Sequence, residues 1–218
     1  MIREVSIVPA ILTDNKANFR TQIERINSFT RRAQIDVTDG VFAQAQTLDI
    51  TNIWWPKNWQ VDLHLMVSKP SEVIDTVLKL NPSLCILHAE ASENLIPIFD
   101  KLKAHDIKTG LALLPSTYPG AVHQYIEAVD HVLIFAGQLG AQGSQADLMQ
   151  MEKIPLVRNM KPELEIGWDG GANLSNIRAL AHADLDVINV GSAISTASNP
   201  AEVYDEMVAE IDKNGVVI

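Results

Sequence analysis

The sequence predicts an α/β fold in which eight parallel strands and the helices between them close into a (β/α)8 TIM barrel. Apolar runs of roughly four to seven residues alternate with longer stretches of helical period, a pattern typical of buried parallel strands joined by helices. The 218 residues divide into eight units of about 25 to 30 residues, the compact limit of a closed barrel. A doubly wound open sheet is the competing architecture, but no Gly-x-Gly-x-x-Gly follows the first strand.

The predicted elements follow this alternation along the whole chain. The strands are expected at residues 5–11, 34–37, 61–66, 84–88, 108–113, 131–135, 163–168 and 187–190. The helices are expected at residues 15–29, 70–80, 95–104, 120–128, 147–160, 173–182 and 200–213. The segment between the second and third predicted strands has the weakest helical pattern, because Trp54-Trp55-Pro56 lies within residues 49–58 and allows only a weak, broken helix. No linker interrupts the pattern, so residues 1–218 are predicted to form one domain.

Composition excludes several classes of partner. The formal charge is −10, with 17 basic and 27 acidic residues, which argues against a nucleic-acid groove. The lone Cys85 lies in an apolar run and cannot form an intrachain disulfide, which favours an intracellular protein. Residues 1–4 lack the features of a signal peptide, and no apolar run is long enough to span a bilayer. We therefore expect a cytoplasmic protein with no nucleic-acid or membrane partner.

Polar side chains gather where the predicted strands end, which is where barrel enzymes carry their chemistry. They are Asp36, His64, His88, Glu90 and Asp169. Asp36 and Gln34 share one face of the second strand, and an inward carboxylate is costly unless it is paired, protonated or bound to metal. The alternative is that Asp36 caps the next segment and that Asp39-Gly40 is only a turn.

His64 has two possible roles. It shares a strand face with Asp62 and Met66, and a satisfied core histidine is the simpler interpretation of a single imidazole. Because Asp36 and Asp169 end other strands, a histidine and two aspartates are also available as ligands for a divalent ion.

Glycines follow the last two strands. Asp169-Gly170-Gly171 and Gly191-Ser192 each connect a strand to a helical segment, where backbone amides can approach an anion. Turns after the seventh and eighth strands often hold a phosphate in barrels, so a phosphorylated substrate is predicted. Residues 137–144 suit a mobile lid or an ordinary loop, and Trp54, Trp55 and Trp59 suit packing or an oligomer contact.

Taken together, these motifs resemble the ribulose-phosphate 3-epimerase family of phosphate-binding (β/α)8 barrels. The carriers of this resemblance are Pro9-Ala10-Ile11-Leu12, Ile35-Asp36-Val37-Thr38-Asp39-Gly40, Asp62-Leu63-His64-Leu65-Met66, His88-Ala89-Glu90-Ala91, Gly110-Leu111-Ala112-Leu113, Asp169-Gly170-Gly171 and Gly191-Ser192-Ala193-Ile194. The likeness runs from about Val5 to Val208, and it implies a TIM barrel of the ribulose-phosphate-binding type.

The resemblance also implies an activity and its residues. Asp36 and Asp169 match the family's acid/base pair, and the same two residues with His64 match its ligands for Zn, Fe or Mn. Gln34 stands where the family has a second metal-binding histidine. Substrate or phosphate contacts are implied for Met66, Gly170, Gly171, Gly191 and Ser192.

Several positions depart from the family pattern. Ala10 replaces a serine, Thr38 and Phe135 replace methionines, and the lid sequence of residues 137–143 differs. The expected activity is 3-epimerisation of a ketose phosphate by a homo-oligomer, with ribulose 5-phosphate the default substrate. Epimerisation of another sugar phosphate and non-catalytic sugar-phosphate binding stay open as alternatives.

Overall fold

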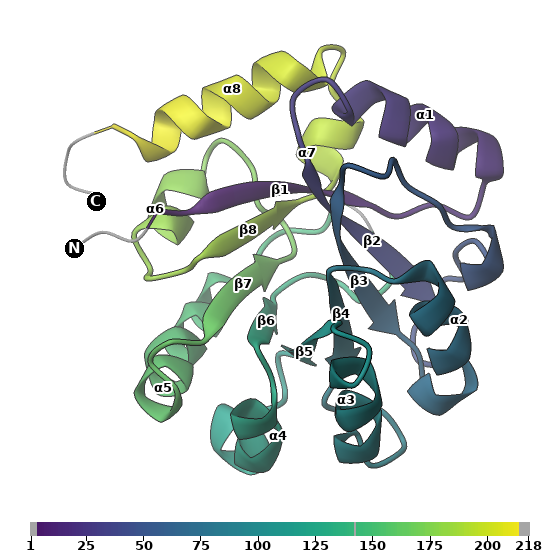
Figure 1. Cartoon of the computed structure of the whole chain (residues 1–218). Coiled ribbons are helices and arrows are strands. Elements are labelled where there is room, and N and C mark those ends of the chain that lie inside the picture. Colours follow the sequence, from purple (N-terminus) through teal and green to yellow (C-terminus); the bar gives the residue numbers. More distant parts are fainter. Residues whose placement is uncertain (1–3, 142, 214–218) are drawn as a thin grey trace.

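The predicted strands form one closed barrel in the computed structural model, which describes residues 4–141 and 143–213. Each strand pairs in parallel with the next along the chain, and the last pairs with the first (Figure 1). The predicted (β/α)8 barrel is therefore confirmed. The strands are β1 (Ser6–Ile11), β2 (Arg32–Thr38), β3 (Gln60–Met66), β4 (Leu84–His88), β5 (Lys108–Leu113), β6 (His131–Phe135), β7 (Glu165–Asp169) and β8 (Val187–Val190).

Helices surround the barrel, and those that the sequence predicts are shorter than expected (Figure 1). They are α1 (Lys16–Ile26), α2 (Ile74–Leu80), α3 (Ile96–Lys103), α4 (His123–Ala128), α5 (Lys153–Met160), α6 (Ile177–Ala181), α7 (Ser192–Ser195) and α8 (Pro200–Ile211). The sequence does not predict α7, because four residues are too few to establish a helical period.

Short 3₁₀ helices replace the first parts of three predicted α-helices, and one forms within residues 49–58, where the sequence predicts only a weak, broken helix. They are η1 (Ile50–Asn52), η2 (Pro70–Glu72), η3 (Pro119–Val122) and η4 (Leu148–Glu152). Pro70 and Pro119 each lack a backbone donor and have a fixed φ, so they suit the start of a helical turn and not its interior. The predicted helix over residues 147–160 likewise divides into η4 and α5.

The interior of the barrel is a packed core. A small apolar cluster of Leu84, Ile86, Ala112 and Leu133 fills its middle. Gly110 faces the same layer, since a Cβ there would lie 2.8 Å from Cγ1 of Ile86. A larger apolar cluster packs the outer faces of the strands against the helices, and the predicted burial of Cys85 is confirmed within it. A ligand must therefore bind at one of the two ends of the barrel.

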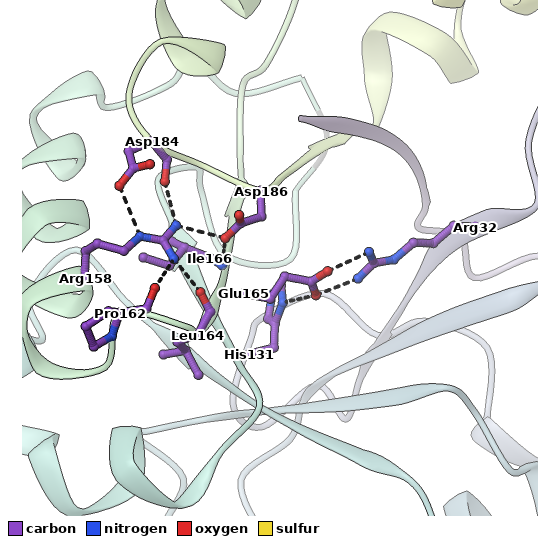
Figure 2. A network of polar contacts seen from close by, with 9 residues as sticks. All are labelled: Arg32, His131, Arg158, Pro162, Leu164, Glu165, Ile166, Asp184 and Asp186. Atoms are coloured by element: carbon purple, nitrogen blue, oxygen red, sulfur yellow. Dashed lines mark hydrogen bonds and ion pairs between the residues drawn. The ribbon is translucent and has the colours of Figure 1, made fainter. Parts of the chain in front are cut away.

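The N-terminal end of the barrel is closed by charged side chains. The guanidinium of Arg32 donates to both carboxylate oxygens of Glu165 at 2.8 and 2.9 Å, and to Oδ2 of Asp62 at 2.9 Å. Nδ1 of His131 lies 2.8 Å from Oε2 of Glu165 (Figure 2). Against the opposing effect of burial, the hydrogen bonds from His131 and Arg32 lower the pKa of Glu165. These contacts tie together β2, β3, β6 and β7.

A second cluster fastens α5 to the neighbouring strands. The guanidinium of Arg158 donates to Oδ2 of Asp184 at 3.1 Å, to Oδ2 of Asp186 at 2.9 Å and to the Leu164 carbonyl at 2.6 Å (Figure 2). Asp186 also accepts a hydrogen bond from the backbone N–H of Ile166 at the start of β7. Both clusters lie away from the strand ends that carry the predicted site. None of the helices within residues 4–141 and 143–213 is long and apolar enough to cross a membrane.

Candidate active site

Four of the predicted site residues meet at the C-terminal end of the barrel. The register pairs Asp36 of β2 with His64 of β3, and Nδ1 of His64 lies 2.9 Å from Oδ1 of Asp36. The same nitrogen lies 3.6 Å from Oδ2 of Asp169 at the end of β7. Nε2 of Gln34 donates to both aspartates, at 2.8 Å to Oδ1 of Asp36 and at 2.8 Å to Oδ2 of Asp169. Two strands on opposite sides of β1 thus contribute one carboxylate each to a single centre.

His88 and Glu90 extend the set of polar contacts around this centre. Nε2 of His88 lies 2.8 Å from Nε2 of His64, and the two imidazole rings are stacked. Nδ1 of His88 lies 3.4 Å from Oε2 of Glu90, whose other oxygen accepts the backbone N–H of Leu114 at 3.0 Å. Both ring nitrogens of His64 thus have a partner that orients the ring, whereas Nδ1 of His88 makes no hydrogen bond among the described residues.

Burial sets the protonation of these groups. Burial and the neighbouring charge of Asp36 raise the pKa of Asp169 to about 7. Burial lowers the pKa of His88 to about 4. Against the effect of burial, the hydrogen bond to Asp36 and the charges of both aspartates raise the pKa of His64. One of the two carboxyl groups can therefore hold a proton near neutral pH, while the imidazole between them favours its charged form.

A cavity opens directly above the two aspartates. It holds about 520 Å³ of space that no protein atom occupies, part of which is open to solvent. The predicted site residues in its lining are Asp36, Met66, Asp169, Gly170, Gly171, Gly191 and Ser192. His64 and Gln34 are fully buried beneath this lining. The residues predicted from strand ends and glycine turns are thus brought together around one space.

The glycines after β7 are required by packing as well as by any ligand. Gly171 has a φ of +70°, and a Cβ there would lie 2.1 Å from the backbone nitrogen of Ala146. Gly170 has a φ of +113°, and a Cβ there would lie 2.2 Å from the nitrogen of Gly137. The loop after β6 therefore lies directly against the turn after β7. Residues 137, 138, 140, 141, 143 and 144 of the predicted lid line the cavity, whereas Gln142 lies outside the described residues.

The simpler interpretation of the Asp39-Gly40 turn is confirmed. The carboxylate of Asp39 accepts the backbone N–H groups of Val41, Phe42 and Ser68 at 2.7 to 2.8 Å. Gly40 has a φ of +73°, as the turn demands. Asp36 does not cap the next segment in the described contacts, because its hydrogen-bond partners are Gln34 and His64. Asp36 within β2 and Asp39 just after it thus make different contacts.

Sequence reasoning left Asn189 out of the site. It pairs with Asp169 in the register of β7 and β8, is buried and lines the cavity. Its Oδ1 has no hydrogen-bond partner among the residues that the structure describes. A polar residue inside the short apolar run of residues 187–190 was the available signal. Phe42 was also missed, and its ring packs on His88 with centroids 4.8 Å apart.

Three residues of the centre can hold a metal ion. Asp36, His64 and Asp169 each offer one ligand atom, and these atoms all lie within 4.8 Å of one another. Two carboxylate oxygens and one imidazole nitrogen suit a divalent ion. Gln34 occupies the fourth position, where its amide nitrogen faces the same two carboxylates. The three ligands fit an ion, and the amide of Gln34 is a ligand only through its oxygen.

A closed (β/α)8 barrel with facing carboxylates and a cavity at the C-terminal strand ends belongs to the class of barrel enzymes. The sequence model of the Ribulose-phosphate 3 epimerase family matches residues 6–195, so the chain belongs to that family.

Curated relatives agree with this assignment. Ribulose-phosphate 3-epimerase of Schizosaccharomyces pombe is 28% identical over 92% of this chain and 91% of its own length. Ribulose-phosphate 3-epimerase, cytoplasmic isoform, of Oryza sativa subsp. japonica is 28% identical over 94% of each chain. The Helicobacter pylori (strain J99) ribulose-phosphate 3-epimerase is 26% identical over 87% of this chain and 90% of its own.

Solved structures support the fold. A 3-hexulose-6-phosphate synthase aligns with a TM-score of 0.71 over 95% of this chain and 99% of its own, at 16% identity. KGPDC from Streptococcus mutans aligns with a TM-score of 0.68 over 96% of this chain and 98% of its own, at 11% identity. At such identities the likeness concerns the barrel alone.

Proposed function

We propose that this chain is a ketose-phosphate 3-epimerase that acts on ribulose 5-phosphate through proton transfer between two aspartates. Its place in the ribulose-phosphate 3 epimerase family makes it an isomerase of sugar phosphates. The observation that carries the mechanism is the pairing of Asp36 and Asp169, which share Gln34 and His64 as partners and both line the cavity.

The proposed reaction uses the two carboxyl groups on opposite faces of the substrate. The hydrogen on C3 is acidic because C3 is adjacent to the keto carbon, and one aspartate removes it to give an enediolate. The other aspartate returns a proton to C3 from the opposite face, which inverts the configuration. This exchange needs one group with a proton and one without, and the raised pKa of Asp169 allows such a pair near neutral pH.

Charge on the enediolate must be stabilised within the buried site. His64 favours its charged form beside both aspartates and contributes positive charge to the centre. A divalent ion would be held by Asp36, Asp169 and the neutral form of His64 and, when bound, would supply charge stabilisation in place of the His64 proton. Zn, Fe and Mn are the ions that the family resemblance implies.

The phosphate is proposed to lie over the turns after β7 and β8. Gly170, Gly171, Gly191 and Ser192 line the cavity on this side. Met66 also lines the cavity and is proposed to contact the sugar.

An isotope-exchange assay tests this function. Ribulose 5-phosphate is incubated with the protein in heavy water, and NMR follows both loss of the C3 proton signal and appearance of the 3-epimer. We expect both to occur, and we expect neither with Asp36→Asn or Asp169→Asn. Absence of exchange with added Zn, Mn or Fe and with every ketose phosphate tried would leave only sugar-phosphate binding.

Another ketose phosphate is the alternative substrate. Gln138, Ala141 and Ser144 of the altered loop after β6 line the cavity, so they would contact the substrate directly. Comparing kcat/KM for pentulose and hexulose phosphates distinguishes the two possibilities. The cytoplasmic location and homo-oligomeric state also stay predictions. Trp54 exposes 45% of its surface, whereas Trp59 is buried and donates to Asn27, so Trp54 is the more available for an oligomer contact.

A further inference from the structure

Gln34 lies fully buried between the two aspartates and contacts both of them. Its Nε2 is 2.8 Å from Oδ1 of Asp36 and 2.8 Å from Oδ2 of Asp169. The amide group has two N–H bonds on that nitrogen, which is one for each carboxylate. A single side chain therefore satisfies two acidic groups that would otherwise face each other in a buried site.

Hydrogen bonding favours the N–H end of the amide on the side of the carboxyl groups. An ionised carboxylate only accepts hydrogen bonds and a protonated one keeps an acceptor oxygen, so two N–H groups can satisfy both residues, whereas an amide oxygen in the same place would meet at least one group that is an acceptor only. The oxygen of Gln34 instead points away and has no hydrogen-bond partner among the described residues. A buried acceptor without a partner carries a free-energy cost, and the two hydrogen bonds on the other side of the amide, charge-assisted where the carboxyl group is ionised, offset it.

The two N–H donors of Gln34 lie between the carboxyl groups, where a bound cation would otherwise offset their charge. The carboxylate oxygens beside Nδ1 of His64 are Oδ1 of Asp36 and Oδ2 of Asp169, and these are the same two oxygens that accept from Gln34. An imidazole at this position could donate one ring nitrogen to an ion, whereas an amide can bind an ion only through its oxygen. An ion held through His64 and these two oxygens would therefore compete with both hydrogen bonds, and Gln34 could become its ligand only by turning its oxygen inward.

We propose that the carboxamide of Gln34 holds Asp36 and Asp169 together in place of a bound cation, so that the acid/base pair is assembled in the ion-free protein. In an alternative state of the same centre, an ion is bound and Oε1 of Gln34 turns toward that ion. This inference rests on the proposed function only for the catalytic role of the two aspartates. The contacts of Gln34 stand independently of any substrate.

Thermal unfolding after removal of metal provides the first test. We expect the midpoint of the wild-type protein to stay within about 1 °C when EDTA is added, because its carboxylates keep their amide partner. Gln34→Leu keeps the volume and removes both donors, so its midpoint should fall by several degrees and rise again with zinc. A wild-type midpoint that falls in EDTA and recovers with zinc would overturn the proposal.

Gln150→Leu is the matched control. Gln150 is also buried, donates through Nε2 to a single aspartate, Asp147, at 2.8 Å, and has a partnerless Oε1 among the described residues. It is not part of the cavity lining. Its substitution should lower the midpoint without creating any response to zinc. A zinc response equal to that of Gln34→Leu would mean that the effect is not specific to the paired aspartates.

Zinc titration provides a second test that does not depend on how Gln34→Leu folds. Calorimetric titration of EDTA-treated, dialysed protein should show that Gln34→His binds zinc on the order of 100-fold more tightly than the wild type. Equal affinity in the two proteins would overturn the proposal. Neither readout involves the reaction, so a failure of the proposed epimerase activity would be seen separately, as absence of C3 exchange while the zinc titration still gave its answer.

Discussion

Replacing Asp169 by asparagine removes a charge that the folded protein must bury, so we expect the variant to be inactive but more stable at pH 8. Burial and the charge of Asp36 raise the pKa of Asp169 from 3.8 to about 7. That difference is about three pH units, which at about 1.4 kcal/mol per unit corresponds to an upper limit of about 4 kcal/mol. The carboxyl is 14% exposed and shares its proton with Asp36, so we expect a gain of about 2 to 4 kcal/mol.

The pH dependence of this gain follows from the direction of the shift. The folded protein binds the Asp169 proton more tightly than the unfolded chain, so wild-type stability falls as the pH rises through the window between about 4 and 7. The asparagine variant lacks this loss. Its advantage should therefore grow by about 2 to 3 kcal/mol between pH 5 and pH 7 and then level off.

Urea unfolding at pH 5, 6, 7 and 8 measures the effect. Asp100→Asn is the control, because Asp100 is an exposed carboxylate on α3, and its substitution should change stability by less than about 0.5 kcal/mol at every pH. An Asp169→Asn advantage that is constant with pH, or that shrinks as pH rises, would show that the folded protein does not raise the pKa of Asp169.

Two further substitutions test the packing around the site and the N-terminal end of the barrel. Gly171→Ala should lower the free energy of unfolding by about 2 to 4 kcal/mol and reduce kcat/KM. The reason is that Gly171 has a φ of +70° and that a Cβ there would lie 2.1 Å from a backbone atom. Gly120→Ala, where no atom lies within 4 Å of the added Cβ, is the control in the same urea and activity assays. Arg158→Met should cost about 2 to 4 kcal/mol in urea unfolding, because Asp186 and the Leu164 carbonyl each lose a charged donor, whereas the exposed Arg20→Met should cost less than about 0.5 kcal/mol. Similar losses in the two arginine variants would contradict the importance of the cluster in Figure 2.

The strands were predictable because continuous apolar runs bounded by polar turns leave little choice for where each strand of a barrel begins and ends. Each predicted strand lies within about two residues of the observed one, and the helix lengths were the main error. Helix ends depend on local capping and on prolines such as Pro70 and Pro119, which favour 3₁₀ turns where the apolar period alone predicts an α-helix.

The candidate site was predictable as a set of residues but not as a set of contacts. Asp36, His64 and Asp169 end different strands, and the closure of the barrel brings them together. The position of His88 against His64 depends on the register of β3 and β4, which pairs His64 with Ile86 and which the sequence does not contain.

The orientation of the Gln34 amide was equally beyond sequence reasoning. It follows from the distances between Nε2 and two carboxylates on separate strands. The family resemblance identified Gln34 as a substitution for a histidine, and the structure gives that substitution a physical consequence. The amide satisfies both carboxylates without a cation.

In the proposed reaction, Asp36 and Asp169 exchange the proton on C3 of a ketose phosphate. Deuterium incorporation at C3 of ribulose 5-phosphate in heavy water, compared among the wild-type protein, Asp36→Asn and Asp169→Asn, measures this exchange. We expect incorporation with the wild type and a loss of about 10³-fold or more in each variant, the magnitude typical of an acid/base group with a full catalytic role. Wild-type exchange that persists undiminished in either variant would contradict the account.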